Sequence, residues 1–220
     1  MASTVRERIY KTIKDDIYYG KLSPGERLIE STLIGRFKSS RSPIREALRQ
    51  MESEGLITCE KNKGFSVCKL SIQEINEIYD LLWLLESYAA RLSAEKVTRK
   101  QIEYLCDVQK KLRVAVKNYD LEAWIENNDL FHEFFAKHSG NRSLERTIET
   151  NYSRIYRFRY TTISIPSHFK DYIKQHEWIL KGVKLNDGEM AEKYMKLHIQ
   201  NVKEVLISSL SGRKWHQRLI

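Results

Sequence analysis

The sequence has few residues that interrupt helices or cross-link the chain. It holds three prolines and three cysteines among 220 residues. Pro24, Pro43 and Pro166 each stand where a turn or the first turn of a helix is expected, so long helices are permitted elsewhere. An odd cysteine count with no secretion signal favours reduced thiols and argues against a disulfide-stabilised extracellular domain.

Long apolar runs are also missing. The longest, residues 81–85, is far too short to cross a bilayer. Residues 1–14 are charged and lack the apolar core of a secretion signal. We therefore expect a cytoplasmic protein that does not interact with membranes.

Positive charge exceeds negative charge in the chain as a whole. Lysine and arginine total 38 against 29 acidic residues, for a net charge of +9 and a pI of about 9.3. Residues 1–70 carry 14 basic and 9 acidic side chains, so the excess is densest there. A polyanionic partner such as nucleic acid fits this distribution.

The first 70 residues read as three helices followed by a small hairpin. Val5, Ile9, Ile13 and Ile17 recur every four residues and predict one apolar helical face. A short helix is expected at 29–37, and a third from an N-cap at Ser42 and Pro43 to about Ser53. Strands are expected at 56–59 and 65–69, joined by a polar turn. This order is typical of a winged helix-turn-helix.

The third helix has two distinct faces. Its buried face is expected to consist of Ile44, Ala47, Leu48 and Met51, while Arg41, Arg45 and Arg49 share another face. Arginine can bind guanine edges or phosphates in the major groove. The alternative is an ordinary solvated basic surface. The DNA-binding residues that we predict are Ser40, Arg41, Ser42, Arg45, Arg49 and, in the wing, Lys63 and Gly64.

After residue 70 every segment has helical periodicity. Helices are expected at about 71–92, 98–117, 121–138, 141–163, 167–185 and 187–210, with Ser71, Asp120, Asn141, Ser167 and Asp187 near their starts. The fold class is therefore mainly α, with a winged helix-turn-helix at 1–70 and an all-helical bundle of about six helices at 71–214. The run at 81–85 is apolar all round and predicts burial in a core or in a dimer interface.

Three histidines of the helical region are candidate metal ligands. His132 follows Asn128 by one helical turn, and His176 and His198 lie on two later helices. Imidazoles from neighbouring helices can converge on a divalent metal. Spacing alone favours three unrelated, locally packed histidines.

The N-terminal region closely resembles the GntR family of bacterial regulators. The resemblance covers residues 22–30, 39–48, 54–57 and 63–67, and Ser40-Arg-Ser-Pro-Ile-Arg-Glu-Ala-Leu48 is its most specific piece. It implies a DNA-binding winged helix-turn-helix, with Arg41 and Arg45 as the chief contacts, and a homodimer on an operator. One departure is Ser31, where relatives often have arginine.

Residues 71–214 resemble the C-terminal ligand-binding domain of the FadR subfamily, known as FCD. The resemblance implies metal ligands at His132, His176 and His198, with Asn128 where aspartate is usual. Asn128 offers only a neutral carbonyl oxygen, and the neighbouring Asp129 points about 100° away on an ideal helix. Three imidazoles favour Zn or Ni as the cofactor.

The resemblance also implies a small-molecule effector, possibly a carboxylate that completes the metal coordination. Relatives often place an arginine near Leu82 to bind such an acid, and its absence favours a less acidic effector or another cation. Arg154, Arg157 and Tyr160 are candidate effector-binding residues; a surface or interface stripe explains them equally well.

The resemblance implies a transcription regulator, and most relatives are repressors. Two other functions are alternatives to this one. A helical metal-dependent enzyme is one, with Glu177 beside His176 as the only neighbouring base. A protein-binding adaptor is the other, using the apolar run at 81–85. The enzyme leaves the basic helix unexplained, and the sequence shows no nucleophile motif and no phosphate loop, so no enzymatic activity and no catalytic residue is expected.

Overall fold

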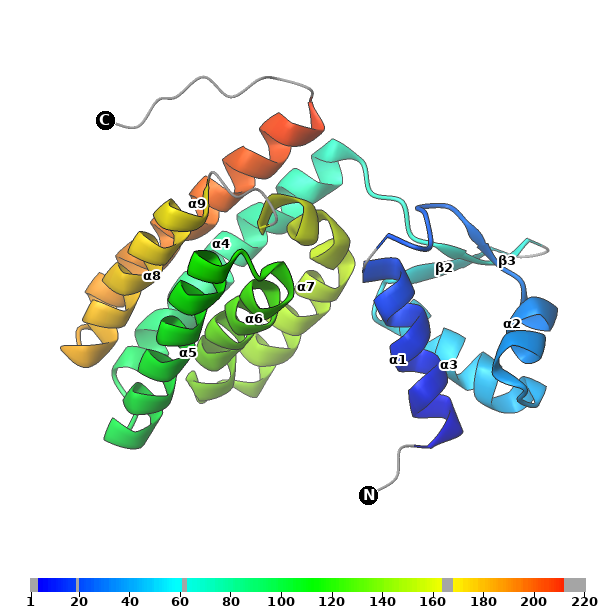
Figure 1. Cartoon of the computed structure of the whole chain (residues 1–220), viewed down its shortest axis with the longest axis horizontal. Helices are drawn as coiled ribbons and strands as arrows, with labels where there is room; N and C mark the ends of the chain where they lie inside the picture. The colour runs from blue at the N-terminus through cyan, green and yellow to red at the C-terminus, as the bar shows by residue number, and fades with distance from the viewer. Residues whose placement is uncertain (1–3, 19, 61–62, 164–167, 212–220) are drawn as a thin grey trace. The chain divides into compact units, whose positions relative to one another are not determined.

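The structure is a computed structural model that describes residues 4–18, 20–60, 63–163 and 168–211, without the side chains of 157–163. The chain divides into two compact units, residues 1–71 with 152–157, and residues 72–151 with 158–220 (Figure 1). Each unit is described by itself below.

The first unit contains three helices and a three-stranded sheet. The helices are α1 (Val5–Tyr18), α2 (Glu30–Phe37) and α3 (Arg41–Ser53). The strands are β1 (Arg27–Leu28), β2 (Ile57–Glu60) and β3 (Gly64–Val67), which pair antiparallel in the order β1-β3-β2. The predicted winged helix-turn-helix is confirmed.

One hydrophobic core holds the first unit together. The predicted face of α3 is fully buried, as are Ile9, Ile13 and Ile17 of α1, which pack with it. Val5, the first residue of α1, is 43% exposed, so the predicted α1 stripe begins one turn too early. Phe65 and Val67 of β3 cover the same core from the sheet.

Two details of the first unit differ from the sequence prediction. The N-cap of α3 is Ser40 rather than Ser42, and Pro43 is the third helical residue. Proline is tolerated there because the first backbone N–H groups of a helix have no partner within the helix. Strand β1 was not expected, since two residues carry too little periodicity to be recognised; it pairs Arg27 with Ser66 and Leu28 with Phe65.

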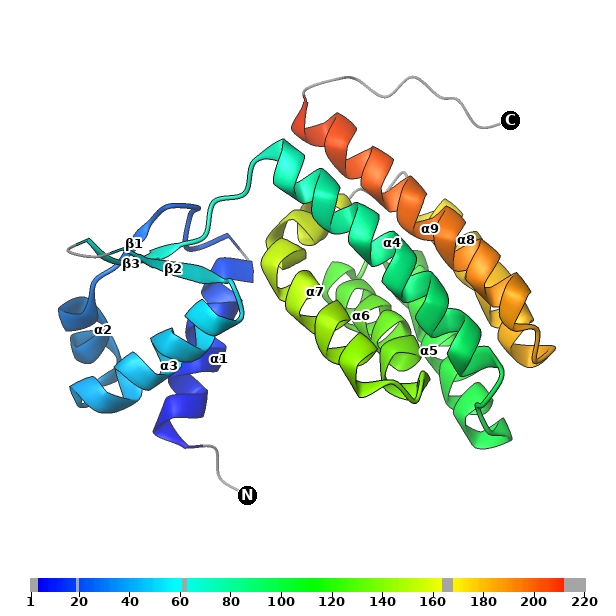
Figure 2. The same cartoon turned by 180° about the vertical axis from the view of Figure 1, so that it is seen from behind.

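Six helices follow residue 71 in the described residues, as predicted. They are α4 (Ile72–Ala94), α5 (Arg99–Asn118), α6 (Leu121–His138), α7 (Arg142–Ile163), α8 (Phe169–Lys184) and α9 (Gly188–Leu210). All of them except residues 152–157 of α7 belong to the second unit. Both views show α4 and α9 side by side along their length, with α8 also beside α9 (Figures 1 and 2).

Side-chain caps fix several starts of these helices. Asp120, Asn141 and Asp187 each accept a backbone N–H of the following turn, as expected. Thr98 forms a capping box with Gln101, which the sequence analysis did not identify. Ser167 lies outside the described residues. No helix in the described part of the chain is long and apolar enough to cross a membrane.

Candidate DNA-binding helix and buried histidine centre

Helix α3 presents its arginines to solvent. The side chains of Arg41, Arg45 and Arg49 are 73%, 53% and 67% exposed, on the face opposite the buried Ile44 and Leu48. The amphipathic sequence of α3 produces this arrangement, because burying one face of the helix turns the four-residue arginine repeat outward. The helix thus offers three long cations along one accessible face.

One acidic side chain, Glu30, pairs with two of these arginines, and Arg49 pairs with Glu52 at 3.8 Å. Glu30, the first residue of α2, has its carboxylate oxygens 3.3 Å from Nε of Arg45 and 3.8 Å from Nε of Arg41. On α3 itself the Ser42 hydroxyl donates to Glu46 at 2.8 Å. The sequence analysis missed Glu30, since only the fold brings the start of α2 against α3.

Arg6 of α1 adds a further cation to this surface. Its guanidinium donates to Oε1 of Gln50 at 2.6 Å, and it lines a shallow depression with Ser42, Arg45, Glu46 and Arg49. The basic surface therefore involves α1 as well as α3. Periodicity places Arg6 only on an exposed face of α1, so the sequence could not assign it to this surface.

The predicted wing residues lie at the hairpin between β2 and β3. Gly64 has a φ of +78°, in the left-handed region where glycine is favoured, and it opens β3. Lys63 precedes it and pairs with the carboxylate of Glu60. Glu60 keeps a lowered pKa because Lys63 donates a hydrogen bond to it.

The three predicted histidines meet inside the second unit. His132 comes from α6, His176 from α8 and His198 from α9, and their exposed fractions are 3%, 0% and 2%. Nε2 of His198 lies 3.2 Å from Nε2 of His132 and 3.3 Å from Nε2 of His176. One ligand atom from each ring falls within 4.8 Å of the others.

Two buried side chains orient these rings. Oε2 of Glu86, on α4, lies 2.7 Å from Nδ1 of His132, and Oε1 of Gln175 lies 2.8 Å from Nδ1 of His198. Both oxygens accept, so each Nδ1 donates and the Nε2 atoms of the two rings face each other. Two ring nitrogens 3.2 Å apart require a proton or a cation between them.

Ring stacking fixes His176. Its ring lies parallel to Phe131 at a centroid distance of 4.0 Å, with an interplanar angle of 9°. Tyr172, one turn earlier on α8, meets His198 edge to face at 5.7 Å. Aromatic packing therefore limits the movement of the imidazoles, as a preorganised ligand set requires.

The spacing of the rings fits a divalent metal. Two imidazole nitrogens bound at 2.0–2.1 Å, with angles between octahedral and tetrahedral values, lie about 2.9–3.4 Å apart. The two close Nε2 pairs of the cluster fall inside this range. Asn128 is 2% exposed and lies on α6 one turn before His132.

Sequence reasoning missed Glu86 and Gln175. Glu86 is the only acid in the stretch 81–94, an unusual place for a carboxylate, and that was a usable signal. Gln175 sits beside His176 in the sequence but orients His198, so only tertiary structure identifies its role. Glu177, considered as a base, instead forms a surface ion pair with Arg113 at 2.7 Å.

The effector-binding predictions concern Leu82 of α4 and three residues of α7. Leu82 is fully buried in the second unit. Arg154 belongs to the segment 152–157, which groups with the first unit. The side chains of Arg157 and Tyr160 lie outside the described residues, so their assignment stays a prediction.

The chain matches two known families over most of its length. Residues 5–67 match the bacterial regulatory proteins of the gntR family, and residues 77–201 match the FCD domain. The chain is 30% identical over 196 residues to the uncharacterized HTH-type transcriptional regulator YdhC of Bacillus subtilis (strain 168), covering 88% of this chain and 87% of YdhC. It is 28% identical to the HTH-type transcriptional repressor RspR of Escherichia coli (strain K12), covering 91% and 88%.

Solved structures agree on the fold. That of E. coli McbR/YncC matches with a TM-score of 0.82 at 23% identity, covering 95% of this chain and all of that one. The matched families and relatives are transcription regulators and not enzymes. The chain therefore belongs to the GntR family of bacterial transcription regulators, with an N-terminal winged helix-turn-helix and a C-terminal FCD domain.

Proposed function

We propose that this regulator is a cytoplasmic repressor that binds a duplex operator as a homodimer and releases it in response to a small-molecule effector. Residues 1–70 form the DNA-binding domain, and residues 71–214 form the effector, metal and dimerisation domain. The observation that carries the proposal is the exposed arginine face of α3.

The DNA contacts follow from that surface. Arg41, Arg45 and Arg49 enter the major groove, where a bidentate arginine–guanine pair discriminates between bases by about 1–3 kcal/mol. Ser40 and Ser42, at the positive end of the α3 dipole, bind phosphates. Lys63 and Gly64 bring the wing to the neighbouring backbone. One such module reads few base pairs, which is why two copies are needed.

The effector domain holds a divalent metal, Zn or Ni, on His132, His176 and His198, with Asn128 as a weaker oxygen ligand. Support comes from the Nε2 spacing, and from Glu86 and Gln175, which select the tautomers that ligation requires. A metal bound there supplies an open coordination position for an oxygen of the effector, such as a carboxylate. Arg154, Arg157 and Tyr160 remain candidate effector-binding residues.

The basic helix is tested with Arg45→Ala. A duplex bound by the wild-type protein is first selected from genomic DNA, and its affinity is then measured by fluorescence anisotropy beside a random duplex of equal length. We expect the selected duplex to lose about 1–3 kcal/mol of binding free energy and the random duplex to lose less.

The matched control is Arg99→Ala, which removes an equally charged, exposed side chain of α5 in the other unit. Unchanged discrimination in Arg45→Ala would contradict the assignment of α3 as the reading helix. A control variant that loses as much affinity would instead indicate a general effect of charge.

A further inference from the structure

Two short rows of polar side chains lie where α1 packs against α3. Arg6, Tyr10 and Lys14 recur every four residues along α1, so they share one face of that helix. Gln50 and Glu54 are likewise one turn apart at the end of α3. All five are half-buried, whereas Ile9 and Ile13 of α1 are fully buried. The two rows therefore meet at the edge of the hydrophobic core, next to solvent.

A chain of hydrogen bonds joins the two rows. The ammonium of Lys14 donates to the Tyr10 hydroxyl at 3.0 Å, and that hydroxyl donates to Oε2 of Glu54. Burial, and then the hydrogen bond to Glu54, raise the pKa of Tyr10 above its ordinary range, so the hydroxyl keeps its proton. Oε1 of Glu54 accepts from Nε2 of Gln50 at 3.0 Å. Because a carboxylate only accepts, the amide of Gln50 turns its NH₂ group toward Glu54 and its oxygen away from it.

The amide oxygen of Gln50 binds Arg6. Nη1 of Arg6 donates to Oε1 of Gln50 at 2.6 Å. This bond occupies one of several N–H donors of a guanidinium whose side chain is 39% exposed. Nη2 of Arg6 lies 3.8 Å from Glu7, which is beyond hydrogen-bond distance. Arg6 is therefore held in one position while other donors stay available to a further acceptor.

The available donors of Arg6 border the depression that Arg45 and Arg49 line from α3. The depression is open to solvent and encloses about 670 Å³, which is wide enough to admit a phosphodiester group. Three guanidiniums and one carboxylate line it, and that carboxylate, of Glu46, already accepts from the Ser42 hydroxyl. Arginine binds phosphate oxygens through parallel N–H bonds, so this surplus of cationic donors favours a phosphate.

We propose that Arg6 binds a phosphate of the DNA backbone and that Gln50, held by Glu54, is its positioning residue. This assignment rests on the DNA binding of the proposed function and names one backbone contact of that surface. Gln50 is then unavailable for reading adenine, because both ends of its amide are engaged within the protein. A phosphate carries no sequence information, so Arg6 strengthens binding to any duplex and fixes the register of α3 in the groove.

The test is the salt dependence of duplex binding by full-length Arg6→Ala. Affinities for the selected duplex and for a random duplex of equal length are measured by fluorescence anisotropy between about 50 and 200 mM KCl. We expect both duplexes to weaken by the same factor, at least about threefold at the lowest salt. The slope of log K against log salt concentration should become shallower by about 0.9 for each bound chain. Arg6→Lys, which keeps the charge, should restore most of the slope.

Arg8→Ala is the matched control for charge. Arg8 is exposed and lies two residues further along α1, about 200° round the helix from Arg6. Its removal changes the net charge equally but takes nothing from the depression, so the slope should stay close to the wild-type value. An equal loss of slope in Arg6→Ala and Arg8→Ala would overturn the contact, since only the charge of the chain would then matter.

A second experiment locates the phosphate. The selected duplex is prepared as a series in which one phosphate at a time is replaced by an uncharged methylphosphonate. We expect at least one position whose neutralisation weakens binding by the wild type and by Arg8→Ala but not by Arg6→Ala. If every position affects Arg6→Ala and the wild type by the same factor, Arg6 contacts no phosphate.

The positioning role of Gln50 is tested by a double-mutant cycle. Gln50→Leu removes the oxygen that holds Arg6, so it should lose part of the same salt slope. Arg6→Ala should then weaken binding by a smaller factor in that background than in the wild type. Additive losses would overturn the positioning role. Equal melting temperatures of Gln50→Leu and the wild type exclude loss of folding as the cause.

These outcomes are distinguishable from failure of the proposed function. If Arg6→Ala binds both duplexes like the wild type while Arg45→Ala loses discrimination, the phosphate contact is refuted and α3 remains the reading helix. A wild-type protein that binds no duplex refutes both proposals.

Discussion

Individual carboxylates position the groups that carry the proposed chemistry. Glu86 is 2% exposed, and its Oε2 lies 2.7 Å from Nδ1 of His132. A metal-ligating imidazole whose other nitrogen donates to a carboxylate is a stronger ligand, and loss of such a partner commonly lowers metal affinity 10- to 100-fold. In the proposed metal site, Glu86 would therefore supply beside His132 part of the negative charge that Asn128 lacks.

Glu86→Gln tests this role. The amide keeps an oxygen acceptor for Nδ1 but loses the charge, so we expect Zn affinity to fall about 10-fold or more, measured by competition with a chromophoric chelator. Glu95→Gln, an exposed position on the same helix, should leave it unchanged. His132→Ala/His176→Ala should bind no metal at this site. Equal affinity in Glu86→Gln and the wild type would exclude the orienting role.

Glu30 acts on the arginines of α3 rather than on the histidines. Its carboxylate neutralises part of the charge of Arg41 and Arg45 and also repels approaching phosphates. We expect Glu30→Gln to tighten binding to a random duplex by about threefold to tenfold at low salt while improving a selected operator less. Glu103→Gln on α5 changes the net charge equally and should have little effect. A selectivity that stays at the wild-type value would contradict a positioning role for Glu30.

The sequence identified the three histidines of the candidate metal site but not the side chains that orient them. His132, His176 and His198 follow from resemblance, since their spacing alone does not distinguish a metal site from local packing. The partners Glu86 and Gln175 lie 46 and 23 positions from the rings that they orient. Periodicity places a side chain on a face but does not say which distant side chain it meets there.

At the scale of elements, the helices were predictable within a few residues because apolar periodicity and caps are local. Helix α6 begins and ends where expected, with Asp120 as its cap. Strand β1 and the start of α3 at Arg41 could not be predicted. A two-residue strand is defined only by its pairing with β3, and the start of α3 depends on the backbone geometry at Ser40. The apolar run at 81–85 was ambiguous for a definite reason: Leu82 faces the core while Leu84 faces outward.

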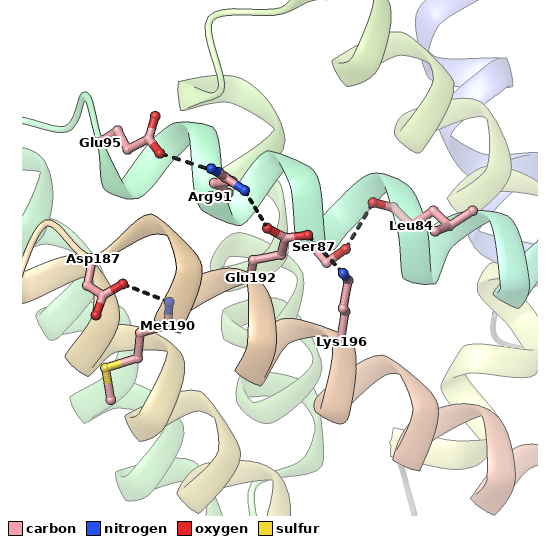
Figure 3. A network of polar contacts seen from close by, with 8 residues as sticks. All are labelled: Leu84, Ser87, Arg91, Glu95, Asp187, Met190, Glu192 and Lys196. Carbon is pink, nitrogen blue, oxygen red and sulfur yellow. Dashed lines mark hydrogen bonds and ion pairs between the residues drawn. The ribbon is translucent and has the colours of Figure 1, made fainter.

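The ion pair between Arg91 of α4 and Glu192 of α9 makes the stability of the fold depend on pH (Figure 3). Hydrogen bonds from Lys196 and then from Arg91 outweigh burial and lower the pKa of Glu192 below its ordinary value of 4.5. The stabilisation is therefore complete above the unfolded pKa and is lost as pH falls through the lower folded pKa.

Glu192→Gln should accordingly lower the Tm at pH 7 by about 1–3 °C, and the difference from the wild type should vanish as the pH falls well below 4.5. Thermal melts followed by circular dichroism between pH 7 and pH 3 measure this. Glu122→Gln, at an exposed position of α6, is the comparison. A difference that stays constant across the pH range would show that the ion pairs do not cause it.

At the scale of the whole molecule, sequence and structure agree on two functional parts with different physical character. The first gathers cations on an exposed helix face, and the second buries a cluster of three histidines within a helical core. Composition indicated only the first, because a buried histidine cluster has no effect on net charge. The families that match residues 5–67 and 77–201 follow the same division.

The three imidazoles come from α6, α8 and α9, and 66 residues separate the first from the last. Holding one ion would tie these three helices together much as a removable cross-link does, and would favour the folded domain in proportion to the logarithm of the free metal concentration. Starved of metal, a cell would then contain not only an unresponsive regulator but fewer copies of it, since the loosened domain is more often unfolded and open to proteases. Metal supply would set the amount of regulator before any effector binds.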